Sequence, residues 1–184
     1  MGWINAGGIG SKQFQCGHCG NLIATHVGYN NDSRKGTIYI CLHCDRPTYF
    51  NEQGSPLPGV PFGAMVEHLP ADVETLYAEA RRCSSMAAYT AAVLLSRKLL
   101  MNIAVSLGAE PGKPFIVYVE YLAANGYVPP NGKGWVDHIR KKGNEATHEI
   151  VLMQQSDAED LLKFGEMLMK FIYEFPNKIP KPAS

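Results

Sequence analysis

The sequence predicts an α+β fold, with a small β-rich domain over residues 1–55, a linker over 56–68 and an all-α helical bundle over 69–184. Glycine, asparagine and β-forming residues dominate the first part. The stretch "GSPLPGVPFG" then places three prolines and three glycines within ten residues, which is typical of a linker. Beyond it, apolar residues recur at three- and four-residue intervals, the spacing of helices that pack on one face.

Composition narrows the class of protein. Hydrophobic residues make up 46% of the chain and charged residues 18%, as in folded globular proteins. The 17 basic and 17 acidic residues cancel, so no global field favours nucleic acid, although a local basic patch is compatible with this balance. No signal peptide is evident, and the longest apolar run is interrupted by Arg97 and Lys98, unlike a membrane span. We therefore expect a cytoplasmic protein with no membrane partner.

The β-rich domain is expected to contain a hairpin. Residues 21–29 and 37–41 are extended runs separated by a polar stretch that ends in glycine, and residues 46–50 supply a candidate third strand.

Four of the five cysteines form two close pairs, "CGHCG" with Cys16 and Cys19 and "CLHCD" with Cys41 and Cys44. Each two-residue gap allows a tight turn to direct two thiolates at one cation, and a hairpin can bring the two turns together. Four sulfurs in a tetrahedron are the ligand set of a structural zinc site, which is closed to water. The sequence therefore predicts that residues 1–55 form a zinc ribbon with one structural Zn²⁺ per chain; the alternatives are a redox pair or cysteines without metal.

Three other residues, His18, His43 and Cys83, have side chains able to bind a metal or act as a nucleophile. His18 and His43 lie inside the pairs and are candidates to replace a ligand, but four cysteines already complete the shell. Cys83 stands alone in a predicted helix, where a small packed hydrophobe is the favoured interpretation over a nucleophile. A domain this short has little core, so bound metal would supply its folding energy.

Five helical segments are expected in the second part, over residues 70–86, 87–108, 114–126, 138–149 and 156–175. The second is apolar on nearly every side, as the central helix of a bundle would be. Ser156 and Glu159 have the spacing of a capping box at the start of the last segment. Short turns between the segments predict a bundle.

The stretch "HIRKKGNEATHE" has two faces when drawn as a helix with 100° between successive residues. One is an apolar stripe of Ile139, Gly143, Ala146 and Ile150. The other is a polar ridge of Asp137, Arg140, Asn144 and His148. The stripe accounts for the glycine, because a neighbouring helix can approach closely at Gly143 and Ala146.

Two interpretations of the ridge remain. It is either a solvated face with an Asp137–Arg140 ion pair, or a site. As a site, Arg140 would hold a phosphate, His148 would move a proton and Asn144 would position one of them, a set able to cleave RNA through its 2′-hydroxyl. Lys141 and Lys142 would assist phosphate binding. No phosphate-cradling glycine loop or dinucleotide fingerprint occurs, so no nucleotide cofactor is expected.

The second part resembles the domain of unknown function 4145 family over roughly residues 69 to 175, through its pattern "R-x-x-G-N-x-A-x-H". That family is related to the HEPN-like helical bundles, many of which are dimeric ribonucleases in defence and toxin systems. The resemblance implies a HEPN-like bundle and a homodimer. The arginine position of the HEPN motif falls on Gly143, and Arg140 lies one helical turn earlier, about 4.5 Å along the axis.

This departure favours a non-catalytic or weakly catalytic binding or adaptor module, in a nucleic-acid-related or anti-phage setting, with an RNA or protein partner. One alternative is a metal-independent ribonuclease that uses Arg140 and His148. A second alternative is a scaffold or oligomerisation unit whose ridge serves only an interface.

Overall fold

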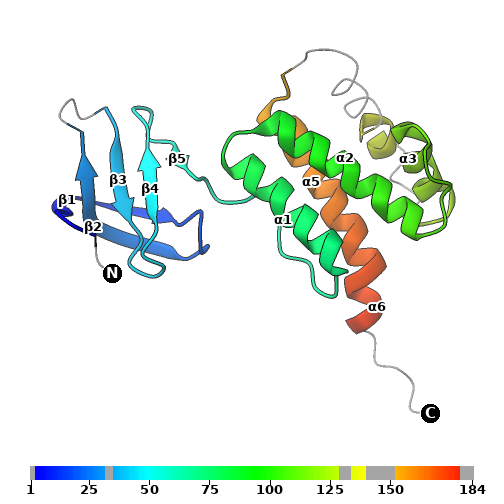
Figure 1. Cartoon of the computed structure of the whole chain (residues 1–184), viewed down its shortest axis with the longest axis horizontal. Coiled ribbons are helices and arrows are strands. Elements are labelled where there is room, and N and C mark those ends of the chain that lie inside the picture. The colour runs from blue at the N-terminus through cyan, green and yellow to red at the C-terminus, as the bar shows by residue number, and fades with distance from the viewer. Residues whose placement is uncertain (1–2, 32–34, 129–133, 140–151, 179–184) are drawn as a thin grey trace, which may run out of the picture. The chain divides into compact units, whose positions relative to one another are not determined.

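The computed structural model describes residues 3–31, 35–128, 134–139 and 152–178 (Figure 1). The chain forms two compact units, Met1–Pro61 and Phe62–Ser184. The first contains an antiparallel sheet and the second contains helices, which confirms the predicted α+β class. The boundary between the units falls inside residues 56–68, the stretch expected to be a linker.

The sheet of the first unit has five strands in the order β1-β2-β3-β4-β5, and each pairs antiparallel with the next. Their bounds are β1 (Gly7–Gln15), β2 (Leu22–Asn30), β3 (Thr37–Ile40), β4 (Pro47–Phe50) and β5 (Pro56–Leu57). The predicted hairpin corresponds to β2 and β3, and the candidate third strand is β4. Strands β1 and β5 were not predicted, because β1 has glycine at three of its nine positions and β5 is only two residues long.

A small aromatic cluster forms the core of this sheet. The ring of Phe14 lies 5.0 Å from that of Phe50 and 6.1 Å from that of Tyr39, centroid to centroid. These three side chains are buried together with Cys16 and Cys41. The core therefore runs directly into the part of the sheet that carries the cysteines.

The helices of the second unit largely follow the predicted segments: α1 (Ala71–Ser85), α2 (Tyr89–Ser106), α3 (Phe115–Ala124) and α5 (Gln155–Met169). Residues 134–139 are also helical. Helix α2 packs against α1, α3 and α5, which makes it the central helix that its apolar sequence predicts (Figure 1). Its buried residues include Val93, Leu99, Leu100 and Ile103.

The start of α5 differs from the prediction. The helix begins at Gln155, and the carboxylate of Asp157 accepts a hydrogen bond from the backbone N–H of Gln154 at 2.8 Å. Ser156 consequently lies in the first turn and is not the capping residue. Sequence spacing alone does not separate the two frames, because Asp157 stands three residues after Gln154 just as Glu159 stands three after Ser156.

The last predicted helix also changes type along its length. Helix α5 continues into a π-helix, η2 (Lys170–Glu174), and then into the short α6 (Phe175–Lys178). A π-helix widens one turn by a residue and is rare within α-helices. Within the described part of the chain, no helix is both long enough and apolar enough to cross a membrane.

Candidate metal centre

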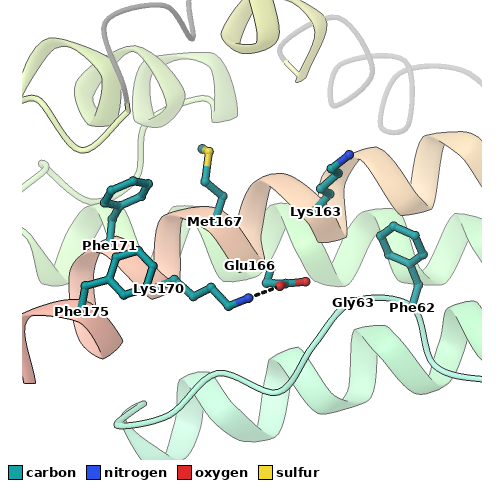
Figure 2. A pocket seen from close by; sticks show the side chains of 8 residues that line it. All are labelled: Phe62, Gly63, Lys163, Glu166, Met167, Lys170, Phe171 and Phe175. Carbon is teal, nitrogen blue, oxygen red and sulfur yellow. Dashed lines mark hydrogen bonds and ion pairs between the residues drawn. The ribbon is translucent and has the colours of Figure 1, made fainter. Parts of the chain in front are cut away.

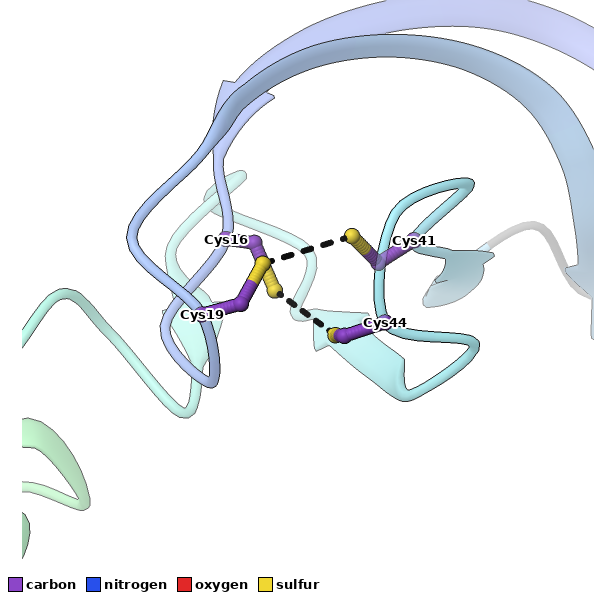
Figure 3. A group of neighbouring side chains, drawn as sticks. All are labelled: Cys16, Cys19, Cys41 and Cys44. Carbon is purple, nitrogen blue, oxygen red and sulfur yellow. Dashed lines mark hydrogen bonds between the residues drawn. The ribbon is translucent and has the colours of Figure 1, made fainter.

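The four paired cysteines meet at one end of the sheet (Figure 3). Cys16 and Cys19 lie in the turn that joins β1 to β2, and Cys41 and Cys44 lie in the turn that joins β3 to β4. All four Sγ atoms are within 4.8 Å of one another. Among the described residues, these cysteines form a cluster with the arrangement of metal ligands.

The sulfur separations match a tetrahedron around a metal ion. The Sγ atoms of Cys16 and Cys44 are 3.8 Å apart, and so are those of Cys19 and Cys41. A metal–sulfur bond of about 2.3 Å in tetrahedral geometry places the sulfurs about 3.8 Å apart. A disulfide needs about 2.05 Å between sulfurs, and all four cysteines are free thiols. The cluster is therefore spaced for a cation held by four sulfurs.

The two turns have the same backbone design. The N–H of Gly20 donates to the carbonyl of Cys16 at 2.8 Å, and that of Asp45 donates to the carbonyl of Cys41 at 2.9 Å. Gly20 and Asp45 both have a left-handed backbone, with φ of 74° and 57°. Glycine adopts this conformation freely, and aspartate tolerates it better than most residues. The residue after each cysteine pair thus closes the turn that aims two sulfurs at one point.

The histidines inside the pairs brace one turn against the other. His18 Nε2 lies 2.9 Å from the carbonyl oxygen of Pro47, which follows the second turn. His43 Nδ1 accepts from the side-chain amide of Asn21, which follows the first turn, at 3.0 Å. Both rings are exposed, and neither belongs to the ligand cluster. His18 and His43 therefore each contact the opposite turn and are not part of the four-cysteine cluster.

Asn21 contacts the cysteine cluster, and the motif spacing in the sequence did not single it out. Its backbone and side-chain N–H groups lower the pKa of Cys19 to about 6, because N–H donors stabilise the thiolate. The side-chain amide lies 3.5 Å from Cys19 Sγ. The repeated spacing "C-x-H-C" offered a signal for it, since the residues after each pair must turn the chain and cover the sulfurs.

Burial acts in the opposite direction on two other cysteines. It raises the pKa of Cys16, and it raises that of Cys44 to about 12, because a thiolate loses hydration there. These thiols hold their protons at neutral pH until a cation replaces the protons. Four thiolates suit soft tetrahedral cations, and they leave no coordination position open for water or substrate. The centre can therefore staple the fold but is not built for metal-assisted hydrolysis.

The second predicted site lies outside the described residues. Arg140, Lys141, Lys142, Asn144 and His148 all fall within residues 140–151, so their arrangement stays a prediction. The two residues before this stretch that could join a site are described. His138 Nε2 lies 2.8 Å from an Asp160 carboxylate oxygen, and Asp137 is exposed.

Cys83 packs as the sequence suggests. Its side chain on α1 is half-buried against the helical core. Within the described part of the chain it belongs to no cluster of metal-binding residues.

Comparison with known protein families identifies the family of the helical unit. A family model described as "Domain of unknown function (DUF4145)" matches residues 78–182, more than half of the chain. The chain therefore belongs to this family, as its resemblance implied. The match lies within the helical unit and does not reach the cysteine cluster. No curated protein and no solved structure matches the chain.

Proposed function

We propose that this member of the DUF4145 family is a protein-binding adaptor, in which a zinc ribbon with one structural Zn²⁺ presents an apolar surface to a partner protein. The observation that supports the zinc ribbon is the spacing of the four sulfurs, which all lie within 4.8 Å of one another and are 3.8 Å apart in two pairs. Zinc is preferred among soft cations because Cys₄ sites on two such turns are its usual structural environment.

The surface of the ribbon supports a protein partner. Six large apolar side chains are exposed on the described part of the first unit: Trp3, Ile4, Leu22, Leu42, Tyr49 and Val60. Leu42 stands between Cys41 and Cys44 and is 64% exposed, and Leu22, where β2 begins after the first turn, is 68% exposed. These two leucines lie at the end of the sheet where the cysteine turns meet, and exposed apolar side chains at one end of a domain favour an interaction surface there.

The charged side chains of the ribbon favour a nucleic-acid partner less than a protein partner. Lys12 Nζ lies over the ring of Phe50 at 4.6 Å, and Lys35 pairs with Glu52 at 3.8 Å. Nucleic-acid binding depends on cations that are free to neutralise phosphates. Both lysines of the ribbon contact other side chains, while Leu22 and Leu42 stay exposed at its cysteine end, so the ribbon fits a protein partner better than RNA.

For the helical unit we propose a HEPN-like bundle that forms homodimers and does not cleave RNA. The support is the sequence departure at Gly143, which stands where the HEPN motif has its arginine. The anti-phage or nucleic-acid-related setting and a cytoplasmic location belong to this proposal as well.

Metal analysis tests the zinc ribbon. Purified protein should contain about one zinc per chain, and a Cys41→Ser variant should contain none. Iron in place of zinc, with the absorption of a thiolate–iron site, would contradict the structural-zinc proposal.

Photo-crosslinking tests the adaptor. A crosslinking residue placed at position 42 should trap a protein, which is then purified and titrated with the chain. Leu42→Asp should weaken that reconstituted binding by about tenfold or more with unchanged zinc content, whereas Leu94→Asp, an exposed site on α2, should not.

An RNA assay separates the alternatives. Wild type and His148→Ala should both leave tRNA and mixed RNA intact. Cleavage by wild type that is lost in His148→Ala would establish the ribonuclease and overturn the adaptor. Tight RNA binding that weakens steeply with salt, at a surface where Leu42→Asp has no effect, would also overturn it.

A further inference from the structure

A pocket of about 560 Å³ opens on the helical unit, and the described residues that line it include none of those discussed as a site so far (Figure 2). It is lined by Phe62, Gly63, Lys163, Glu166, Met167, Lys170, Phe171 and Phe175. Its volume lies in the range of sites for small organic ligands. In Figure 2 the rings of Phe171 and Phe175 stand at one end, Phe62 stands at the other, and Glu166 and Lys170 lie between them.

One wall of this pocket is a stretch of backbone that α1 holds in place. The guanidinium of Arg81 donates to the carbonyls of Phe62 and Gly63, at 2.8 and 2.6 Å. The hydroxyl of Tyr77 donates to the carbonyl of Ala64 at 3.0 Å. Residues 62–64 therefore have their carbonyl groups fixed from one side.

The same stretch is held from the other side by α5 and η2. The N–H of Ala64 donates to Glu166 Oε2 at 2.9 Å, and the N–H of Glu67 donates to Glu174 Oε2 at 3.1 Å. Hydrogen bonds on both sides make this wall preformed. A preformed pocket spends less free energy on ordering itself when a ligand binds.

The described lining of the pocket has more positive than negative charge. Glu166 uses both carboxylate oxygens, one for the Ala64 N–H and the other for the ammonium of Lys170. An ammonium has three N–H donors, so Lys170 has donors beyond the one given to Glu166. Lys163 adds a second ammonium, which lies 5.8 Å from the ring centroid of Trp135. Two lysines and one glutamate leave the lining with one excess positive charge.

The rest of the lining is apolar, and two of its phenylalanines are exposed. Phe171 and Phe175 are 49% and 43% exposed, and their rings meet edge to face with centroids 5.3 Å apart. Lys170 and Phe171 belong to the π-helix η2, and Phe175 follows it directly. π-helical turns occur frequently at functional sites. The irregular turn thus coincides with the aromatic end of the pocket.

We propose that this pocket binds a small amphipathic carboxylate: its apolar chain or ring would lie on Met167, Phe171 and Phe175, and its carboxylate would take the ammonium groups of Lys163 and Lys170. The charge decides the class, since the described lining has two ammonium groups and one carboxylate, and that carboxylate already accepts from Ala64 and Lys170. A cationic ligand would meet this excess of positive charge, whereas a carboxylate would neutralise it. This site is independent of the ribbon and of the adaptor proposal.

Decanoate serves as the probe, with decanol as its uncharged counterpart, each titrated into the full zinc-loaded chain by calorimetry. We expect decanoate to bind once per chain and decanol to bind about tenfold more weakly or worse. Equal affinity for the two would show that the ammonium groups contribute nothing, and it would overturn the proposal. Several weak decanoate sites per chain would overturn it as well.

Two variants locate the binding. Lys163→Met keeps the length of the side chain and removes its charge, so it should weaken decanoate binding by about tenfold. Lys98→Met, at an exposed lysine of α2 outside the lining, should leave binding unchanged. Equal behaviour of these two variants contradicts the proposal, and unchanged zinc content and circular dichroism confirm that both are folded.

A third variant separates a ligand pocket from an interface between copies. Phe171→Ala should weaken decanoate binding and leave the oligomeric state in sedimentation analysis as it is in wild type. If Phe171→Ala instead converts a dimer to a monomer, and wild type does not bind decanoate, the pocket is covered by a second copy and the proposal fails.

Discussion

The helical unit and the ribbon differ in what stabilises each of them. Among the described residues, one continuous core in the helical unit contains twenty-five buried hydrophobic residues, whereas the core cluster of the ribbon contains five, and two of those five are the cysteines Cys16 and Cys41. A core of three aromatic rings is small for an independent fold, because a short chain buries too little apolar surface to offset its lost conformational entropy. Small domains with such a core commonly gain stability from a structural metal ion that cross-links the chain.

The same chain thus contains one unit whose small core adjoins a four-cysteine cluster able to bind a metal ion, and one unit that extensive apolar packing stabilises. In the ribbon the pKa values of Cys16 and Cys44 are raised, so both thiols favour the protonated state in the absence of a metal ion. In the bundle the central helix α2 has Val93, Leu100 and Ile103 completely buried. Perturbations should therefore separate the two units cleanly.

Loss of the metal is the perturbation with the largest expected effect. Cys41→Ser, or a strong chelator, should unfold the ribbon, since structural zinc contributes roughly 10–16 kcal/mol of apparent binding energy at neutral pH in comparable small domains. The amide NMR signals of residues 3–61 should collapse while those of the helices persist. Cys83→Ser should change neither the spectrum nor the metal content, and a ribbon that stays folded without metal would erase the contrast between the units.

A cavity in the bundle should have the converse effect. Leu100 is fully buried on α2, so Leu100→Ala should destabilise the helical unit by roughly 2–5 kcal/mol. Thermal or urea unfolding followed by circular dichroism measures this loss. Leu94→Ala, at a position 41% exposed on the same helix, is the matched control and should cost much less. Zinc content should be normal in both, because the metal centre does not depend on the bundle core.

Gly63 offers a smaller and more local test. Its φ is 79°, and a Cβ there would lie 2.8 Å from a Glu166 carboxylate oxygen and 3.0 Å from the Tyr77 hydroxyl. Gly112 has almost the same φ of 80° but no atom within 4 Å of the added Cβ. Gly112→Ala should therefore cost only backbone strain, roughly 1–2 kcal/mol.

Gly63→Ala should cost the same strain plus the displacement of Glu166, and we expect it to be the more destabilising of the two in urea unfolding. Equal costs would mean that the wall of the pocket moves freely, in conflict with its hydrogen bonds. The pair thus measures how firmly residues 62–64 belong to the helical unit.

The smallest expected effect is a pH dependence confined to the bundle. The ammonium of Lys178, followed by the N–H of Glu67, lowers the pKa of Glu174. A carboxyl whose folded pKa is depressed stabilises the fold above its unfolded pKa, near 4.5, and loses that contribution as the pH falls through the folded pKa. Glu174→Gln should therefore lower the stability of the bundle at neutral pH, and the difference from wild type should shrink in acid. A difference that is constant with pH would show that the ion pair is not its cause.

Much of the fold follows from short-range patterns. The spacing within "CGHCG" and "CLHCD" predicted the cluster of Cys16, Cys19, Cys41 and Cys44, because two ligands three residues apart already define half of a tetrahedral site. Helical periodicity predicted α1, α2, α3 and α5 for the same reason, since each face of a helix is set by residues three and four apart. The sequence pattern also predicted the family, and the match over residues 78–182 confirmed it.

Long-range contacts decided the rest. Strand β1 has a weak pattern of its own, and its place depends on pairing with β2 and on the burial of Phe14. The wall of the pocket was expected to be linker, yet the N–H of Ala64 bonds to Glu166, 102 positions along the chain. The π-helix that carries Lys170 and Phe171 leaves no mark in the periodicity of the sequence. The sequence by itself determined which cysteines form pairs and which residues form helices, because both depend on neighbours within a turn. Only the tertiary structure decided where a pocket forms, because its walls come from segments that meet after the chain has folded.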